Sequence, residues 1–334
     1  MMKHITMSDI AQEIGVSTVT VSKALSDKEG VSDALREKIK KKAAELGYVY
    51  NSMAKSIKEG ISGNIGILVS ERYFYDNAFY AKLYNRNVMD FRERGYSAIL
   101  EIISIADENQ GNLPGMIVNN KIDGLVVLGQ LKSRYVSMIS ELGLPFLFMD
   151  FYDEELDVDC VVSDNVYGSY LMTRYLIKSG HKKIAFVGNI FSTSSIMDRY
   201  LGYHRALLQN HLEERPEWVI SDRDEVEVFR NIALPEEMPD AFVCNCDESA
   251  FYLISQLKNL GYRIPEDISI VGFDDSMLAE YSQPRLTTYR VALEGISETV
   301  VDVIIRKISE PTYVSGRKVV GGAIVVRESV AKMK

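Results

Sequence analysis

The sequence predicts an α/β protein in which a small all-helical N-terminal segment precedes two doubly wound α/β subdomains. From residue 64 onward, short apolar runs alternate with helical stretches, which is the pattern of buried parallel strands and their crossover helices. Before that point the chain shows helical periodicity alone. Residues 64 to 334 are numerous enough for two such subdomains facing each other.

Three short helices are expected in the N-terminal segment. Thr6, Ser17 and Ser32 can each cap a helix, and Gly15 and Gly47 can end the first and the third. Apolar residues recur on one face of each helix: Met7, Ile10, Ala11 and Ile14, then Val21, Ala24 and Leu25, then Leu35, Ile39, Ala43 and Leu46. Because helices this short are marginal alone in water, they are expected to pack on one another.

The first two helices are joined only by Gly15 and Val16, a connection as tight as that of a helix-turn-helix unit. The alternative is a three-helix unit with no role on DNA. The outward residues of the second helix favour DNA binding, because short side chains can approach base edges; they are Thr18, Val19, Ser22 and Lys23. The third helix carries a basic run that could contact phosphates but is more often only a solvated face: Arg36, Lys38, Lys40, Lys41 and Lys42.

Net charge differs in sign between the two parts of the chain. The whole chain carries −9, which by itself disfavours nucleic acid and anionic membranes as partners. Residues 1 to 63 hold ten basic and eight acidic residues, a net of +2, so the remainder carries −11. The acidity therefore belongs to the α/β region and does not argue against DNA binding by the N-terminal segment.

Cysteine use and the lack of targeting patterns predict the compartment. Cys160, Cys244 and Cys246 cannot build a disulfide framework, and no histidine stands near enough in sequence to complete a zinc site. The N-terminus lacks the pattern of a secretory signal, and no apolar run approaches the roughly 20 residues that span a bilayer. We expect a soluble cytoplasmic protein with no membrane partner and no metal.

Residues 48 to 63 connect the two parts. Asn51 can cap one short helix that ends at Gly60, and Ser62 and Gly63 follow as a flexible link. A helix of this length is expected to fray unless something holds it.

The α/β region is predicted from its apolar runs, which read as strands over 65–69, 98–103, 124–128, 146–149, 183–187, 241–243 and 268–272. Helices are expected between them, among others over 78–94, 166–178, 199–212 and 247–260. No G-x-G-x-x-G or G-x-x-x-x-G-K-[ST] pattern follows any of these strands, so no nucleotide or other cofactor is expected.

Several stretches together resemble the lactose-repressor (LacI) family of bacterial transcription regulators. They are TMSDIAQEIGVSTVTVSKALS, VSDALREKIKKKAAELGYVYNSMAKSIKEG, NIGILVS, SDNVYG, GHKKIAFVGN, RIPEDISIVGFDD and PRLTTYR, and they follow the family's order over almost the whole chain. The resemblance implies a helix-turn-helix headpiece over 1–50, a hinge helix and linker over 51–63, and an effector-binding and dimerisation core over 64–334. This core would resemble periplasmic sugar-binding proteins, with an N-subdomain over about 64–162 and 291–320 and a C-subdomain over about 163–290 and 321–334.

The resemblance assigns base reading to Thr18, Val19 and Lys23. Lys23 can donate to guanine O6 and N7, Thr18 can hydrogen-bond a base edge, and Val19 suits a thymine methyl. Phosphate contacts fall to three neighbouring hydroxyl residues, Ser17, Thr20 and Ser22. In the hinge, Ile57 would be the apolar wedge in the minor groove, where relatives usually have leucine; the residues beside it are Ala54, Lys55 and Lys58.

For the effector, the resemblance points to Phe79, Asp150, Arg199 and Asp274. The two aspartates end predicted parallel strands, at the edge where open α/β sheets bind ligands. Carboxylates accept from hydroxyls, Arg199 offers a fork of donors, and Phe79 can face a sugar with its ring. The alternatives are core packing for Phe79 and a structural ion pair for Arg199. Asp247, which follows a cysteine where many relatives have asparagine, is a further expected contact.

The sequence thus predicts a repressor whose affinity for a palindromic operator is controlled by a small effector, expected to be a sugar, bound between the core subdomains. A homodimer associated with the nucleoid is expected, because no leucine heptad follows the core to make a tetramer. The alternative is a cytoplasmic sugar-binding protein without DNA-binding function, which the helix-turn-helix opposes. An enzyme is not expected, because no histidine forms a recognisable catalytic spacing; the histidines are His4, His181, His204 and His211.

Overall fold

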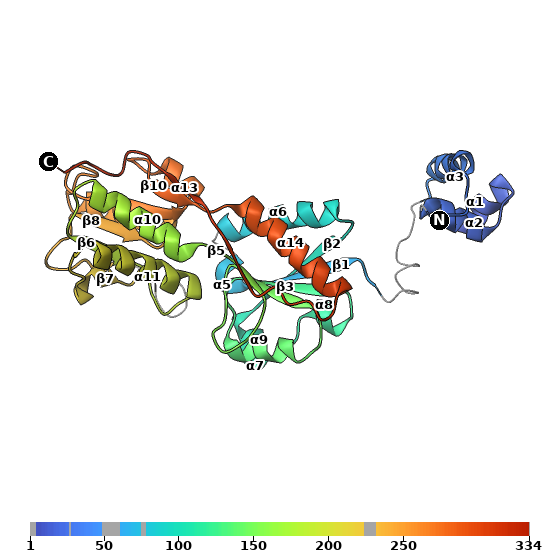
Figure 1. Cartoon of the computed structure of the whole chain (residues 1–334), viewed down its shortest axis with the longest axis horizontal. Helices are drawn as coiled ribbons and strands as arrows, with labels where there is room; N and C mark the ends of the chain where they lie inside the picture. Colours follow the sequence, from blue (N-terminus) through green and yellow to red (C-terminus); the bar gives the residue numbers. More distant parts are fainter. Residues whose placement is uncertain (1–4, 27, 49–60, 75–77, 224–231, 334) are drawn as a thin grey trace. The chain divides into compact units, whose positions relative to one another are not determined.

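The computed structural model describes residues 5–26, 28–48, 61–74, 78–223 and 232–333. The chain divides into two compact units, Met1–Ser62 and Gly63–Lys334. Helices alone make up the described part of the first unit, and the second contains two sheets with helices around them (Figure 1).

The first unit holds α1 (Met7–Ile14), α2 (Thr18–Leu25) and α3 (Asp33–Glu45). Thr6 caps α1 in a capping box, with the Asp9 amide 3.3 Å from Thr6 Oγ1 and the Thr6 amide 2.7 Å from Asp9 Oδ2. Ser17 caps α2 by accepting from the Thr20 amide at 3.1 Å. Ser32 occupies the N-cap position of α3, as predicted. Its side chain makes no capping hydrogen bond, so the prediction that it caps the helix is wrong.

The three helices pack as their apolar stripes predict. Each of them contributes two residues to one buried cluster, which consists of Ile10, Ala11, Val21, Ala24, Ile39 and Ala43. The other predicted stripe residues pack partly buried against this cluster. The prediction that these short helices stabilise one another is confirmed.

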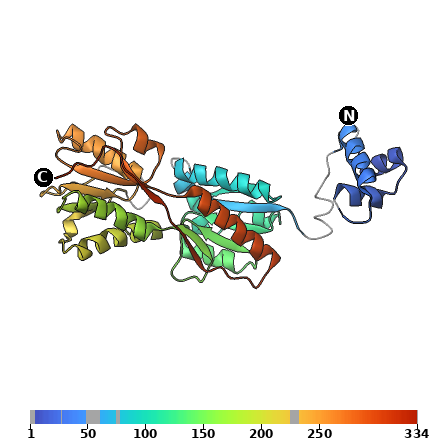
Figure 2. The same ribbon diagram turned by 45° about the horizontal axis from the view of Figure 1, so that its top comes forward.

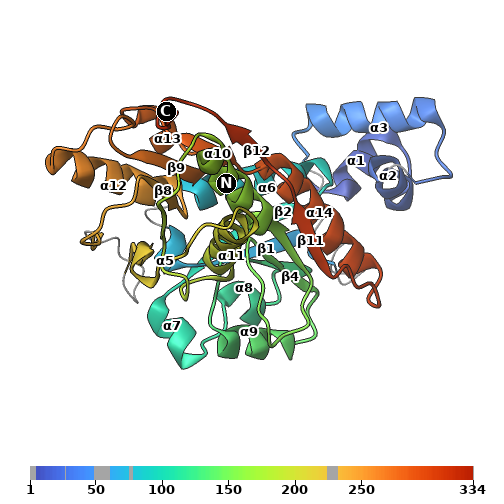
Figure 3. The same ribbon diagram turned by 60° about the vertical axis from the view of Figure 1, so that its left-hand side comes forward.

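The N-lobe, our name for the part of the second unit around its first sheet, is built on a parallel six-stranded sheet of order β11-β5-β4-β3-β1-β2. Its strands are β1 (Asn64–Ser70), β2 (Ser97–Ile103), β3 (Gly124–Leu128), β4 (Phe146–Met149), β5 (Cys160–Ser163) and β11 (Arg317–Val320). Its helices are α5 (Glu71–Phe74), α6 (Ala78–Glu93), α7 (Ile105–Gln110), α8 (Gly115–Val118), α9 (Ser133–Ser140) and α14 (Leu293–Ser309). Figure 3 shows α14 and α6 on one side of this sheet and α7 and α9 on the other.

The C-lobe is built on a second six-stranded sheet of order β12-β10-β9-β8-β6-β7. Its strands are β6 (Ile184–Val187), β7 (Val219–Ile220), β8 (Ala241–Cys244), β9 (Ser269–Asp274), β10 (Thr287–Arg290) and β12 (Ala323–Val325). Its helices are α10 (Asn165–Lys178), α11 (Ser194–Gln209), α12 (Asp247–Asn259), α13 (Met277–Tyr281) and the 3-10 turn η1 (Pro216–Trp218). The edge strand β12 runs antiparallel to β10, and the other pairs are parallel.

The chain passes between the lobes after β5, after β10 and after β11 (Figures 1 and 2). Each lobe is therefore built from chain segments that lie far apart in the sequence, and the carboxyl ends of its strands come from these different segments. Such strand ends are where open α/β sheets place ligands.

The predicted strands all exist, with ends shifted by a residue or two, but several elements lie outside the prediction. They are β5, β7, β10, β11, β12 and α14 among others. The helix expected over 199–212 begins earlier, at Ser194, because Thr193 caps it by accepting from the Ile196 amide at 3.2 Å. Within the described ranges no helix is long and apolar enough to cross a membrane.

Candidate functional site

The outer face of α2 carries the residues expected to read bases. Thr18, Val19 and Lys23 are exposed, whereas Val21 and Ala24 on the opposite face are buried. Val19 keeps 62% of its surface exposed, although it is an apolar residue. This row of short side chains is the surface that α2 can offer to a DNA groove.

Two of the residues expected at phosphates, Ser17 and Thr20, lie at the N-terminus of α2, and Ser22 lies one turn before its end. Ser17 and Thr20 share a hydrogen bond between their hydroxyl oxygens at 2.8 Å, and Ser17 also caps the helix. The Ser22 carbonyl accepts from the Ser26 hydroxyl at 2.6 Å. A helix N-terminus carries partial positive charge, so this end of α2 suits a phosphate.

The remaining DNA predictions have different outcomes. Arg36 does not extend from α3 like Lys38 and Lys41, which are exposed; its guanidinium lies against backbone carbonyls. The hinge residues lie outside the described residues: Ala54, Lys55, Ile57 and Lys58.

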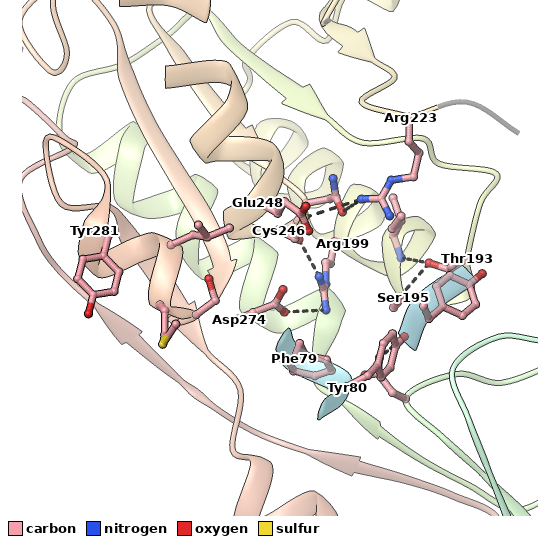
Figure 4. A pocket seen from close by; sticks show the side chains of 17 residues that line it. Phe79, Tyr80, Thr193, Ser195, Arg199, Arg223, Cys246, Glu248, Asp274 and Tyr281 are labelled. Atoms are coloured by element: carbon pink, nitrogen blue, oxygen red, sulfur yellow. Dashed lines mark hydrogen bonds and ion pairs between the residues drawn. The ribbon is translucent and has the colours of Figure 1, made fainter. Parts of the chain in front are cut away.

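A cavity of about 310 Å³ opens between the N-lobe and the C-lobe (Figure 4). The N-lobe contributes aromatic residues and one aspartate: Tyr73, Phe79, Tyr80 and Asp150. The C-lobe contributes mostly polar residues: Thr193, Ser195, Ile196, Arg199, Arg223, Asn245, Cys246, Glu248, Asp274, Ser276, Met277, Leu278 and Tyr281. Its volume lies in the range of small-molecule sites.

Arg199 occupies the centre of this cavity and is held in place from several sides (Figure 4). Its Nε donates to Asn165 Oδ1 at 2.9 Å, and its Nη1 donates to the Asn245 carbonyl at 2.7 Å. The guanidinium also lies 3.9 Å from the centroid of the Phe273 ring. Its Nη2 is 3.4 Å from Asp274 Oδ1, so the remaining donors face the cavity beside a carboxyl group.

Asp150 directly follows β4 and Asp274 is the last residue of β9, and both have a strained backbone. Their φ angles are 69° and 104°, in the left-handed region that non-glycine residues rarely adopt. Burial raises the pKa of Asp150 to about 6 and that of Asp274 to about 8, with Arg199 acting in the opposite direction on both. One buried oxygen of each carboxyl, Oδ1, has no hydrogen-bond partner in the structure.

Aromatic rings form the N-lobe wall of the cavity. Phe79 packs edge-on against Tyr80, with ring centroids 5.4 Å apart, and Tyr73 lies 5.8 Å from Tyr80. The Tyr80 hydroxyl donates to Asp150 Oδ2 at 3.1 Å, which fixes that carboxyl on one side. Phe79 thus lines the cavity, and its contact with an effector stays a prediction. Tyr80 is an additional wall residue that the sequence analysis did not single out.

Asp247 lies behind the cavity wall, not on it, which corrects its expected place. Its carboxylate accepts from the Ser276 amide at 2.6 Å and from the Thr288 hydroxyl at 2.5 Å. Burial raises its pKa to about 7. These protein donors satisfy the carboxylate, so Asp247 connects α12 to strand β10 and to the segment that follows β9.

A polar cluster around Asp222 was missed by the sequence analysis. Arg223 lines the cavity and contacts Asp222 with two nitrogens, Nε at 3.0 Å and Nη2 at 2.8 Å. Asn245 also donates to Asp222, at 2.7 Å. Asp222 follows β7, the same kind of position as Asp150 and Asp274, but β7 has only two residues and leaves no strand pattern.

Further contacts join the lobes at the edge of the cavity. The Ser194 amide donates to Gln130 Oε1 at 2.7 Å, and the Tyr152 hydroxyl donates to Asp198 Oδ1 at 2.9 Å. Arg317 pairs with Asp198 at 2.7 Å. No cluster of three or more metal-ligating side chains occurs among the residues that the structure describes.

Two family models match this chain. "Bacterial regulatory proteins, lacI family" matches residues 6–51, and "Periplasmic binding protein-like domain" matches residues 173–330. The HTH-type transcriptional repressor PurR of Vibrio vulnificus is 30% identical over 334 residues, covering 98% of this chain and 99% of that protein. The ribose operon repressor of Haemophilus influenzae is 30% identical over 335 residues, with 98% of this chain and 99% of that protein covered.

Solved structures resemble the whole fold. A lac repressor dimer bound to operator and the anti-inducer ONPF matches with a TM-score of 0.79 at 22% identity. The match covers 98% of this chain and 100% of that chain. A complex of the transcriptional regulator CelR with cellobiose matches with a TM-score of 0.71 at 26% identity, over 97% of this chain and 99% of that one.

Proposed function

This chain belongs to the lacI family of bacterial regulatory proteins, and from that premise we propose that it represses transcription at a palindromic operator under the control of a small sugar. It is a DNA-binding regulator of the repressor type, as its relatives over nearly the full length are. The observation that carries the effector proposal is a pair of buried carboxyl oxygens in one cavity, Asp150 Oδ1 and Asp274 Oδ1, that accept no hydrogen bond from the described residues. Asp274 Oδ1 has an ion-pair contact with Arg199 at 3.4 Å.

Operator reading is assigned to α2. Thr18, Val19 and Lys23 form an exposed row over a buried stripe, and an apolar residue as exposed as Val19 suits contact with a thymine methyl. Ser17, Thr20 and Ser22 would hold the helix on phosphates. For the minor groove we propose the hinge residues that lie outside the described ranges: Ala54, Lys55, Ile57 and Lys58.

A polyhydroxylated effector would satisfy the cavity. Burying a polar atom without a hydrogen bond costs free energy, so the Oδ1 atoms of Asp150 and Asp274 favour a ligand that brings donors. Arg199 adds donors of its own, and Phe79 and Tyr80 offer apolar ring faces for C–H groups. A sugar has both kinds of surface. Two similar proteins support a sugar as the effector, because one is named a ribose operon repressor and the other was solved as a complex with cellobiose.

We also propose that the active form is a homodimer in the cytoplasm, on the nucleoid. The edge strand β2 leaves apolar residues half-buried: Ala98, Ile99, Leu100 and Ile102. An edge strand of this kind is a surface for association. Two headpieces would then read two half-sites, and ligand-dependent movement of the lobes would change their fit to the operator.

A ligand screen tests the effector proposal. Thermal unfolding of the full chain is followed with a panel of sugars, and a sugar that binds is expected to raise the midpoint. Asp274→Asn and Arg199→Ala should abolish that rise. Asp302→Asn changes an exposed aspartate of α14 outside the cavity and should keep it. Equal stabilisation of all four proteins would show that the ligand binds elsewhere.

A further inference from the structure

We propose that Arg36 of α3 is a positioning residue for base reading: it holds the C-terminal turn of α2 and the loop behind it, and so fixes where Lys23 points. This inference rests on the proposed reading of the operator by α2. It assigns to Arg36 a role other than the phosphate contact that a basic run on α3 suggests.

The guanidinium of Arg36 joins two neighbouring segments. Its Nη1 donates to the carbonyl oxygens of Lys23 and Ala24, each at 3.3 Å, in the last turn of α2. Its Nη2 donates to the carbonyls of Lys28 at 2.7 Å and Val31 at 3.5 Å, in the loop between α2 and α3. One side chain thus ties the end of the recognition helix to the loop that follows it.

Side-chain donors reinforce the end of α2. The last carbonyls of a helix lack partners within it and carry partial negative charge, which a cation stabilises. No left-handed glycine closes α2, because its C-cap Ser26 has a φ of −103°. Backbone amides reach these carbonyls, since Ser26 donates to Ser22 and Ala24 and Lys28 donates to Lys23. Two side chains add further donors, because the Ser26 hydroxyl donates to the Ser22 carbonyl at 2.6 Å and Arg36 contacts the next two carbonyls.

The loop that Arg36 holds also lies against the Lys23 side chain. A Cβ atom at Gly30 would stand 3.3 Å from Lys23 Nζ, so the ammonium group packs closely on this loop. Gly30 has a φ of +92°, a conformation that suits glycine. Both the backbone carbonyl and the ammonium of Lys23 are therefore placed by the segment that Arg36 ties down.

Lysine cannot replace arginine in this role. The contacts require a planar fork whose two ends reach different carbonyls, whereas an ammonium is a single point of charge. Arg36→Lys keeps the charge and Arg36→Gln removes it, so the pair separates position from electrostatics. Lys38→Gln is the matched control, because Lys38 is an exposed cation on the same helix.

The experiment measures the affinity of the full chain for an operator selected from random DNA and for unrelated DNA of equal length, at several salt concentrations. Both Arg36 variants are expected to bind the operator about tenfold or more weakly than the parent, a loss of about 1.4 kcal/mol. Their affinity for unrelated DNA should equal that of the parent. The salt dependence of binding by Arg36→Lys should also equal that of the parent. Lys38→Gln should keep the parent's preference for the operator. Amide hydrogen exchange should quicken over residues 22–31 in both Arg36 variants alone.

Two results would overturn the proposal. If Arg36→Lys binds the operator like the parent and Arg36→Gln only lowers the salt slope, Arg36 is a phosphate contact. If exchange quickens over the whole of 5–48 in both variants, Arg36 serves folding and not position. Failure of the parent to select any operator would contradict the proposed DNA reading, and local exchange changes over 22–31 would then still report the Arg36 contacts on their own.

Discussion

At the scale of single residues, two aspartates at strand ends set the chemistry of the cavity. Asp150 and Asp274 combine positive φ with a buried carboxyl oxygen that lacks a hydrogen-bond partner. Each of these features costs free energy, and such costs persist where the surrounding structure imposes them, commonly at binding sites. A ligand that donates to both carboxyls would recover part of that cost.

The raised pKa values predict how stability changes with pH. Burial raises the pKa of Asp274 to about 8 and that of Asp247 to about 7. A carboxyl with a raised pKa in the folded state binds protons more tightly there, so its contribution to stability is complete at low pH and is lost as pH rises through the folded pKa. The free energy of unfolding of the core should therefore fall between about pH 4, the ordinary pKa of an aspartate, and about pH 8.

Asp274→Asn tests this directly, because asparagine does not titrate. The difference in unfolding free energy between variant and parent, measured by urea unfolding at several pH values, should move in favour of the variant as pH rises. Asp302→Asn, an exposed change, should give a difference that does not depend on pH in this way. A constant difference for Asp274→Asn would mean that Asp274 is ionised throughout the range.

The place of a functional residue in the fold could be predicted only where the adjacent sequence shows which helix or strand it belongs to. Asp150 and Asp274 follow clear apolar strands, so their place at a sheet edge was predictable. Asp247 begins a helix, and nothing local shows that Ser276 and Thr288 satisfy its carboxylate. The role of each cavity residue toward an effector stays a prediction.

At the scale of elements, local signals predicted the headpiece helices and failed for the C-terminal strands. Caps and apolar stripes lie within each short helix, so α1, α2 and α3 could be placed from the sequence. Strand β11 is mostly exposed and pairs with β5, which lies far away in the sequence. Such a strand shows no alternation of apolar and polar residues, because its pairing with β5 and not its own sequence determines its conformation.

The packing of α10 on α11 depends on Gly202. A Cβ atom at this position would lie 2.1 Å from the Val166 carbonyl oxygen, so the two helix backbones approach closely. Gly202→Ala should force the helices apart and lower the free energy of unfolding by about 1–3 kcal/mol, although alanine favours helix. Urea unfolding measures this. The control is Gly295→Ala on α14, where the added Cβ atom would lie 3.1 Å from a side-chain atom and not against backbone. Gly261 is not a suitable control, because its φ of +91° would strain an alanine. Equal stability of Gly202→Ala and the parent would contradict the close approach.

Asp198 links the lobes through two N-lobe residues. It accepts from the Tyr152 hydroxyl at 2.9 Å and pairs with Arg317, whose guanidinium lies 3.8 Å from the Tyr152 ring centroid. We predict that Asp198→Asn weakens this contact and reduces effector affinity by about threefold to tenfold, because the proposed effector lies between the lobes that this contact holds together. Calorimetric titration with the sugar that stabilises the parent measures it. Unchanged affinity would show that these contacts do not favour closure.

At the scale of the whole molecule, the division of charge explains how an acidic protein can bind DNA selectively. The net of −11 on residues 64 to 334 disfavours indiscriminate contact with DNA, and the first 63 residues carry only +2. A headpiece of such low net charge offers few phosphate contacts, so we propose that affinity comes from placed groups on α2 and from the pairing of two headpieces. This balance favours a regulator of a short palindromic site over a general DNA-binding protein.

The most direct test of this account is a titration of operator DNA with the parent, Lys23→Ala and Lys41→Ala. The operator is selected from random DNA with the parent, and each protein is also titrated with unrelated DNA. We predict that Lys23→Ala loses operator preference, about tenfold or more, while Lys41→Ala keeps it, because base reading is proposed for Lys23 and not for Lys41, an exposed cation of α3. Equal losses for both variants, or no preference of the parent for any sequence, would contradict the claim that this chain reads an operator through α2.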